Sequence, residues 1–191
     1  MDIHTLRRRN IILVVFLLVA VTLACNFNRT ISTPAHTVPV STAAVESLET
    51  AVGEAFQEAQ TSGTIELEIT EAQLTSLIAF ELKERGAGYI ANPQIFLQDG
   101  QVLMTAQVVR QGLSASARVA LKVQIDPVGR AVFDVISANI GPLPLPGDII
   151  AEIEERINLA FQQQIDSLAP NLSIERIIID QGVMSITGRT N

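Results

Sequence analysis

The sequence predicts an α+β fold in which a long, curved antiparallel sheet wraps around a long amphipathic helix, with additional helices on its N-terminal side. Two observations lead to this fold. The chain from Gln94 to Gly147 has the pattern of four strands joined by tight turns, and Asp148 then begins a helical pattern that continues to about Leu168. Because a sheet with one apolar face has to bury that face against another layer, we expect the helix to cover it.

The clearest strand covers residues 113–125, where apolar and polar side chains alternate. Successive side chains of a strand point to opposite faces, so this strand has one apolar and one polar face. Thirteen residues at ~3.3 Å each span roughly 43 Å, and a strand of this length must twist and curl. The apolar set is Leu113, Ala115, Ala117, Val119, Leu121, Val123 and Ile125, and the intervening set is Ser114, Ser116, Arg118, Ala120, Lys122 and Gln124.

Turn residues separate this strand from its neighbours. Asp-Gly and Gln-Gly pairs favour two-residue hairpin turns, and an Asp-Pro-Val-Gly sequence has the residue order of a type I turn. A corner from Gly141 to Gly147 follows, and its three prolines cannot continue the ladder as central-strand residues. The turns are Asp99-Gly100, Gln111-Gly112 and Asp126-Pro127-Val128-Gly129, and the strands beside the long one are 94–98, 101–110 and 130–140.

The sequence predicts that the strand 130–140 is apolar on both faces. Val132, Ile136, Ala138 and Ile140 then share the second face. Ordinary burial beneath the N-terminal helices and an apolar ligand groove both explain such a pattern. The sequence leaves these two explanations open.

The N-terminus has the parts of a secretion signal. Arg7, Arg8 and Arg9 precede an apolar run of 14 residues, 11–24, which ends before Cys25, the only cysteine. The segment resembles the lipobox of bacterial lipoproteins, which implies that residues 1–24 are removed and that Cys25 is lipidated. An uncleaved anchor helix is the alternative. In both cases the three arginines keep the N-terminus inside, and the rest of the chain lies outside the cytoplasmic membrane.

A tether, a helix, a strand and a second helix precede the sheet. Residues 25–42 are rich in Ser, Thr and Pro and predict a flexible tether, and residues 43–63 predict an amphipathic helix with its end signal. The domain, 64–191, then starts with an alternating strand over 64–69. Thr70 and Gln73 form a capping-box pattern for a helix that stops near Gly86.

The final part of the chain predicts a long helix followed by a hairpin. The helix 148–168 places Ile150, Ile153, Ile157, Phe161, Ile165 and Leu168 on one stripe. A hairpin with its turn at Asp180-Gln181-Gly182 follows. Its sequence resembles the hairpin around Asp99-Gly100, although hairpins in general share this turn chemistry.

Composition argues against several kinds of function. Both histidines, His4 and His36, precede the domain, so Ser-His-Asp and Cys-His nucleophiles are absent from it and a metal site is not expected. No glycine-rich phosphate loop occurs, and we expect no cofactor. Without residues 1–24 the chain keeps 10 basic and 19 acidic residues, a formal charge of −9, which argues against a nucleic-acid partner. We therefore expect a protein that is not an enzyme.

The order of elements from about Thr64 to Gly188 resembles the LmeA-like and YpmS-like families of bacterial envelope proteins, which are similar in shape to tubular lipid-binding domains of the BPI type. The matching features are Thr70-Glu71 with Leu74, Asn92-Pro93, Asp99-Gly100, Ile140-Gly141 with Leu143, Pro144 and Pro146, and the hairpin at Asp180 to Gly182. The resemblance implies a curved sheet on a long helix that holds phospholipid acyl chains. It implies no catalytic residue.

We therefore expect an extracytoplasmic lipoprotein, anchored through Cys25, that binds phospholipid or another long apolar ligand in a groove between sheet and helix. The residues expected in the groove are Leu77, Phe80, Leu143, Leu145, Ile149, Ile150, Ile153, Ile157 and Phe161. The alternative is a protein-interaction module with a solid core, an accessory in envelope assembly or secretion. The protein partner of such a module is not indicated by the sequence.

Overall fold

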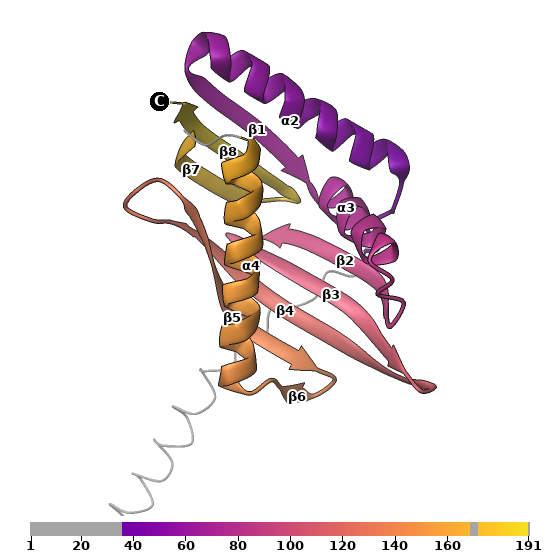
Figure 1. Cartoon of the computed structure of the whole chain (residues 1–191). Helices are drawn as coiled ribbons and strands as arrows, with labels where there is room; N and C mark the ends of the chain where they lie inside the picture. The colour runs from indigo at the N-terminus through magenta and orange to yellow at the C-terminus, as the bar shows by residue number, and fades with distance from the viewer. Residues whose placement is uncertain (1–35, 169–171, 191) are drawn as a thin grey trace, which may run out of the picture. The chain divides into compact units, whose positions relative to one another are not determined.

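The computed structural model describes residues 36–168 and 172–190, so the signal segment, Cys25 and most of the predicted tether lie outside the described residues. The described chain is α+β, as predicted, with three helices and two antiparallel sheets (Figure 1). The helices are α2 (Thr42–Ser62), α3 (Glu71–Glu84) and α4 (Gly147–Leu168). The strands are β1 (Thr64–Thr70), β2 (Ile90–Gln98), β3 (Gln101–Arg110), β4 (Leu113–Ile125), β5 (Ala131–Ile140), β6 (Leu143–Pro144), β7 (Leu172–Asp180) and β8 (Val183–Thr190).

The predicted ladder forms the larger sheet, whose strands follow chain order from β2 to β6. Its last strand is a two-residue segment of the proline corner, in which Leu143 and Pro144 pair with Ile140 and Asn139. The smaller sheet has the order β1-β8-β7, so the strand before α3 pairs with the final hairpin. The corner therefore ends the larger sheet and leads directly into α4.

A β-bulge at Ile136 shows that the expectation of a strand apolar on both faces was wrong. The pairing of β4 with β5 skips Ile136, so the alternation in β5 shifts by one residue at this point. Ala138 and Ile140 consequently share the apolar face with Val135, whereas Val132 lies opposite Gln124 on the polar face. The bulge places five apolar pairs in register, which are Ala117–Ile140, Val119–Ala138, Leu121–Val135, Val123–Phe133 and Ile125–Ala131.

Helix α2 packs on the smaller sheet. The Ser41 side chain caps its first turn by accepting from the amide of Ala44, and Gly63 ends it with a φ of 74°. A positive φ favours glycine because it has no Cβ to clash. A separate apolar cluster joins helix and sheet and consists of Ala55, Ala59 and Ile65 with Phe56, Leu67 and Leu172 packed against it.

The main core lies where the two sheets and the helices α3 and α4 meet. Its buried members come from β2, β3 and β4 on one side and from the final hairpin on the other. Leu74 and Ile78 of α3 and Ile157 of α4 pack against them. The buried set is Ile95, Leu97, Val102, Leu121, Ile179 and Met184.

Helix α4 binds the open edge of β5 through polar side chains spaced four residues apart. The Asn158 side chain accepts from the amide of Phe133 and donates to its carbonyl, both at 2.8 Å. Glu154 accepts from the amide of Val135 at 2.8 Å, and Gln162 donates to the carbonyl of Ala131 at 3.0 Å. Residues at this spacing lie on one helix face, so α4 supplies partners to backbone groups that no strand of the described sheet pairs with there.

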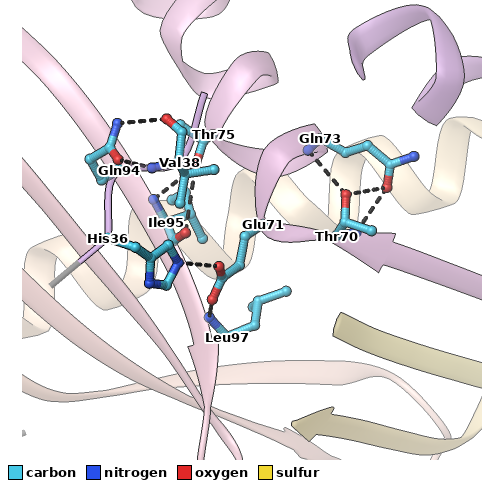
Figure 2. Close-up of polar contacts among 9 residues, drawn as sticks. All are labelled: His36, Val38, Thr70, Glu71, Gln73, Thr75, Gln94, Ile95 and Leu97. Carbon is cyan, nitrogen blue, oxygen red and sulfur yellow. Dashed lines mark hydrogen bonds and ion pairs between the residues drawn. The ribbon is translucent and has the colours of Figure 1, made fainter. Parts of the chain in front are cut away.

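Helix α3 completes the opposite edge in the same way (Figure 2). The fully buried Thr75 accepts from the amide of Ile95 at 2.9 Å, and Glu71, one turn earlier, accepts from the amide of Leu97 at 2.7 Å. The helix starts at the predicted capping box of Thr70 and Gln73. Helix side chains therefore bind backbone groups at the edge of β2 near Ile95 and Leu97 and at the edge of β5 from Ala131 to Val135, which protects these stretches from pairing with other chains.

No helix within residues 36–168 and 172–190 combines the length and the apolarity needed to cross a bilayer.

Candidate functional site

A pocket of about 650 Å³ lies between α3 and the apolar face of the larger sheet. A cavity of this size is within the range of small-molecule sites, which is about 300 to 1,000 Å³. Most of its lining is aliphatic. The helix contributes Leu77, Ile78, Glu81, Leu82 and Arg85, and the sheet contributes Ile90, Pro93, Gln94, Ile95, Met104, Thr105, Ala106, Ala117 and Val119.

Two small side chains explain why the space is hollow. Ala106 of β3 and Ala117 of β4 lie directly opposite each other in the antiparallel register, and both line the pocket. Because each alanine side chain is a single methyl group, a gap remains between the sheet and α3 at these two positions. Larger side chains there would contact the helix. A second irregularity, a register shift in β2 between Ala91 and Gln94, lies beside them. The pocket therefore results from features of the sheet itself, the two alanines and the neighbouring register shift.

Polar groups of the lining are engaged with protein partners. Glu81 and Arg85 form an ion pair of 3.0 Å, with side chains 44% and 78% exposed, so this pair lies at the rim. Gln94 accepts from the amide of Val38 at 2.7 Å and donates to its carbonyl at 3.3 Å. Because Glu81 is the single carboxylate of the lining and is paired, the pocket lacks the two facing acids that carboxylate catalysis needs.

The last residues of the predicted tether lie against the wall of this site (Figure 2). Val38 is buried, and the amide of Ser41 donates to the hydroxyl of the buried Ser76 at 3.1 Å. His36 contacts Glu71 at 3.1 Å and packs edge-on against the ring of Phe96. Residues 36–41 have no regular secondary structure, and these contacts tie them to α3 and β2.

The predicted groove residues are distributed over several places. Leu77 lines the pocket, and the other eight do not. Phe80 is half-buried on α3, Leu145 is half-buried in the corner, and Leu143 is exposed on β6. Along α4, Ile149 is exposed, Ile150 and Ile153 are half-buried, Ile157 packs on the main core, and Phe161 packs against the ring of Phe133 at 4.9 Å between centroids.

Sequence reasoning placed the groove beside α4 because that helix has the longer apolar stripe. The signal that indicates the observed pocket was present in the sequence, as alanines at positions 106 and 117 of two strands with a known turn between them. Counting outward from the turn at Gln111-Gly112 brings them into register. Small residues facing each other on an apolar sheet face indicate a hollow.

Other carboxylates of the described chain lie outside the pocket. Glu152 pairs with Arg156 at 2.8 Å, and Glu66 and Glu68 are exposed on β1. Asp134 accepts from Gln124 across the strands. Within the described part of the chain, no group of three or more His, Cys, Asp and Glu residues is arranged to hold a metal ion.

No family model, no curated protein and no solved structure matches the chain.

Proposed function

We propose that the protein is a membrane-anchored, extracytoplasmic lipoprotein that binds phospholipid or another long apolar ligand in the pocket between α3 and the larger sheet, without catalysing a reaction on it. The observation that supports it most is the pocket itself, about 650 Å³ of mainly aliphatic lining that opens at a charged rim. Such a site suits an amphiphile, whose chain is buried while its polar end stays at the rim.

The anchor is the second part of the proposal. The basic residues 7–9, the apolar run 11–24 and the sole cysteine at 25 support lipidation of Cys25 and cleavage of the chain just before it. One acyl chain gives only weak membrane binding, and stable anchoring takes two chains or one chain with a second contact. A diacylglyceryl group on Cys25 meets this requirement. The ligand class agrees with the one implied by the resemblance to the LmeA-like and YpmS-like families.

The test is native mass spectrometry of the full chain after mild detergent extraction, together with titration of a fluorescent fatty-acid probe. We expect a co-purifying mass in the range of a lipid and saturable uptake of the probe, with competition between the two. A chain that carries no lipid and takes up no probe would rule out the ligand-binding proposal.

An interaction module is the alternative, and one observation favours it. The side chain of Ile178 on β7 is 52% exposed, although isoleucine is usually buried. The edge of β7 itself is bound by turns of the larger sheet, because the Ile179 carbonyl accepts from the amide of Gly100 and the Ile174 amide donates to the carbonyl of Gly129. A partner that packs against the exposed face of β7 would cover Ile178. A chain without lipid whose Ile178→Asp variant keeps its fold but loses association with a purified partner would support the module over the lipid carrier.

A further inference from the structure

Exposed apolar side chains gather at one end of the larger sheet, which we call the distal end. It lies opposite the turns Asp99-Gly100 and Asp126–Gly129 that meet the final hairpin, and it is at the bottom and lower right of Figure 1. The most exposed members are Leu113 at 77%, Leu143 at 69% and Tyr89 at 58%. The complete set is Tyr89, Val109, Leu113, Ile140, Leu143 and Ile149.

Backbone contacts place these residues at the same end. The amide of Val109 donates to the carbonyl of Tyr89 at 2.7 Å, and Leu113 pairs with Arg110 across the β3–β4 turn. Farther across the sheet, Ile140 of β5 pairs with Ala117 of β4 and with Leu143 of β6. Five of the six side chains therefore belong to neighbouring turns and strand ends, and Ile149 lies in the first turn of α4, which directly follows the corner.

We infer that the distal end is a membrane-docking surface whose apolar side chains enter the interface of a phospholipid bilayer. The side chains project from turns and strand ends, which suits insertion between lipid headgroups. Tyrosine has an apolar ring and a polar hydroxyl, and is enriched where membrane meets water. Arg85 and Arg110 flank Tyr89 and Leu113 in the chain, and their long side chains can keep the charge at headgroup level while the stems stay in the apolar zone.

The pocket and the anchor both favour a bilayer as the occupant. The pocket lining extends to Arg85 and Ile90, on either side of Tyr89, so docking brings the rim to the lipid surface. Ten residues lie between Cys25 and His36, and these eleven residue-to-residue steps reach about 40 Å at most. The domain therefore stays near the membrane if Cys25 is lipidated, and in this respect the inference rests on the proposed function.

Charge at the distal end is mixed, and this sets the expected lipid dependence. The cationic side chains of Lys83, Arg85 and Arg110 are balanced by the carboxylates of Glu84, Asp148 and Glu81, the last of which is the ion-pair partner of Arg85. Apolar insertion should therefore hold the domain on zwitterionic phosphatidylcholine, with little dependence on salt, because no excess of positive charge attracts anionic lipid.

The test uses the absence of tryptophan from the chain, which makes Tyr89→Trp a single fluorescent reporter. The full chain is incorporated into phosphatidylcholine vesicles with plain or brominated acyl chains, which quench tryptophan on contact. We expect the emission of the Tyr89→Trp protein to move to shorter wavelength and to fall by about twofold or more in brominated vesicles, as for a residue at the interface. Val128→Trp is the matched control, because Val128 is 67% exposed on the β4–β5 turn, away from the distal end, and should be unaffected.

A further variant tests whether the quenching depends on the exposed leucines of the distal end. Leu113→Glu with Leu143→Glu in the Tyr89→Trp background should abolish the quenching while the circular dichroism stays the same, since both leucines are exposed. Equal emission of Tyr89→Trp in plain and brominated vesicles would overturn the inference, as would a shift that depends on protein concentration and not on bromine, which would indicate a contact between copies. If the chain shows this quenching but takes up no acyl probe, the proposal of ligand binding in the pocket is wrong and the inference of a membrane-docking surface still holds.

Discussion

Gly100 and Gly182 stand in a reciprocal relationship. The amide of Gly100 donates to the carbonyl of Ile179 at 3.0 Å, and the amide of Gly182 donates to the carbonyl of Leu97 at 2.9 Å. Each carbonyl belongs to the residue three positions before the other glycine, so the two hairpins meet through a local two-fold arrangement. Their similarity in sequence thus has a counterpart in contact. The main core contains matching members of both hairpins, Leu97 and Ile179, Val102 and Met184, Ile95 and Ile177, and Met104 and Ile186.

Replacement of either glycine by alanine should weaken the joint between the sheets. Gly100 has a φ of 73° and Gly182 a φ of 82°, and a side chain in this region costs roughly 1–2 kcal/mol. We expect each variant to lower the free energy of unfolding by about 1 kcal/mol, because alanine also restricts the unfolded chain. Gly53→Ala in α2 is the control, for which we expect the free energy of unfolding to rise. No atom lies within 4 Å of its added Cβ, so urea unfolding should show a gain of about 0.5–1 kcal/mol.

Local signals account for how well the strands were predicted. The expected segments 101–110 and 113–125 coincide with β3 and β4, because period-two alternation and Gly-containing turns are properties of neighbouring residues. The turn residues Asp99 and Gln111 adopt a φ of 52°, and each precedes a glycine with positive φ, as two-residue hairpins require.

The features that the sequence did not predict depend on contacts between residues far apart in the chain. The bulge at Ile136 depends on how β5 meets β4, and the sequence of β5 alone reads as a strand with two apolar faces. The roles of Glu154 and Thr75 at the sheet edges require knowing which helix lies beside which strand. The pocket could not be assigned to α3 for the same reason, although Ala106 and Ala117 carried part of the signal.

The buried Thr75 should prove more important for stability than its size suggests. Thr75→Val keeps the shape but removes the acceptor of the Ile95 amide, and a buried unsatisfied amide costs about 1–3 kcal/mol. Thermal and urea unfolding should both show this loss. Thr50→Val on the exposed face of α2, where the hydroxyl bonds only to the carbonyl of Glu46, should change stability by about 0.5 kcal/mol or less. Equal effects of the two variants would contradict the role of Thr75 at the edge of β2.

Asn158 should hold α4 to the sheet. Asn158→Leu removes both hydrogen bonds to Phe133 and leaves that backbone amide without its partner, so we expect a loss of about 1–3 kcal/mol in the free energy of unfolding. Hydrogen exchange should report faster exchange at the Phe133 amide in particular. The exposed Gln163 of the same helix gives the control Gln163→Leu, which should leave exchange at Phe133 unchanged. Unaltered exchange in Asn158→Leu would show that the helix is held by its apolar contacts alone.

Cys25→Ser distinguishes the two explanations of the N-terminus. If Cys25 is lipidated, the variant should lose incorporation of labelled fatty acid and should keep the uncleaved mass, since cleavage follows lipidation in lipoproteins. An uncleaved anchor helix, in contrast, gives the mass of the uncleaved, unlipidated chain and the same membrane association with and without the cysteine. Intact mass measurement of the full chain, extracted from the membrane fraction, is the deciding observation.

Filling the pocket should separate ligand binding from folding. Ala117→Phe adds a ring beneath α3 at a position where the lining is hollow, so the overpacking cost of about 1–3 kcal/mol seen in tight cores should be mostly avoided. The ring occupies space that an acyl chain needs, and we expect affinity for the fluorescent fatty-acid probe to fall by about tenfold or more, equivalent to about 1.4 kcal/mol. Ala160→Phe on the exposed side of α4 adds the same ring outside the pocket and should bind the probe as the unchanged chain does. Uptake that survives Ala117→Phe in a folded protein would place the ligand outside this pocket.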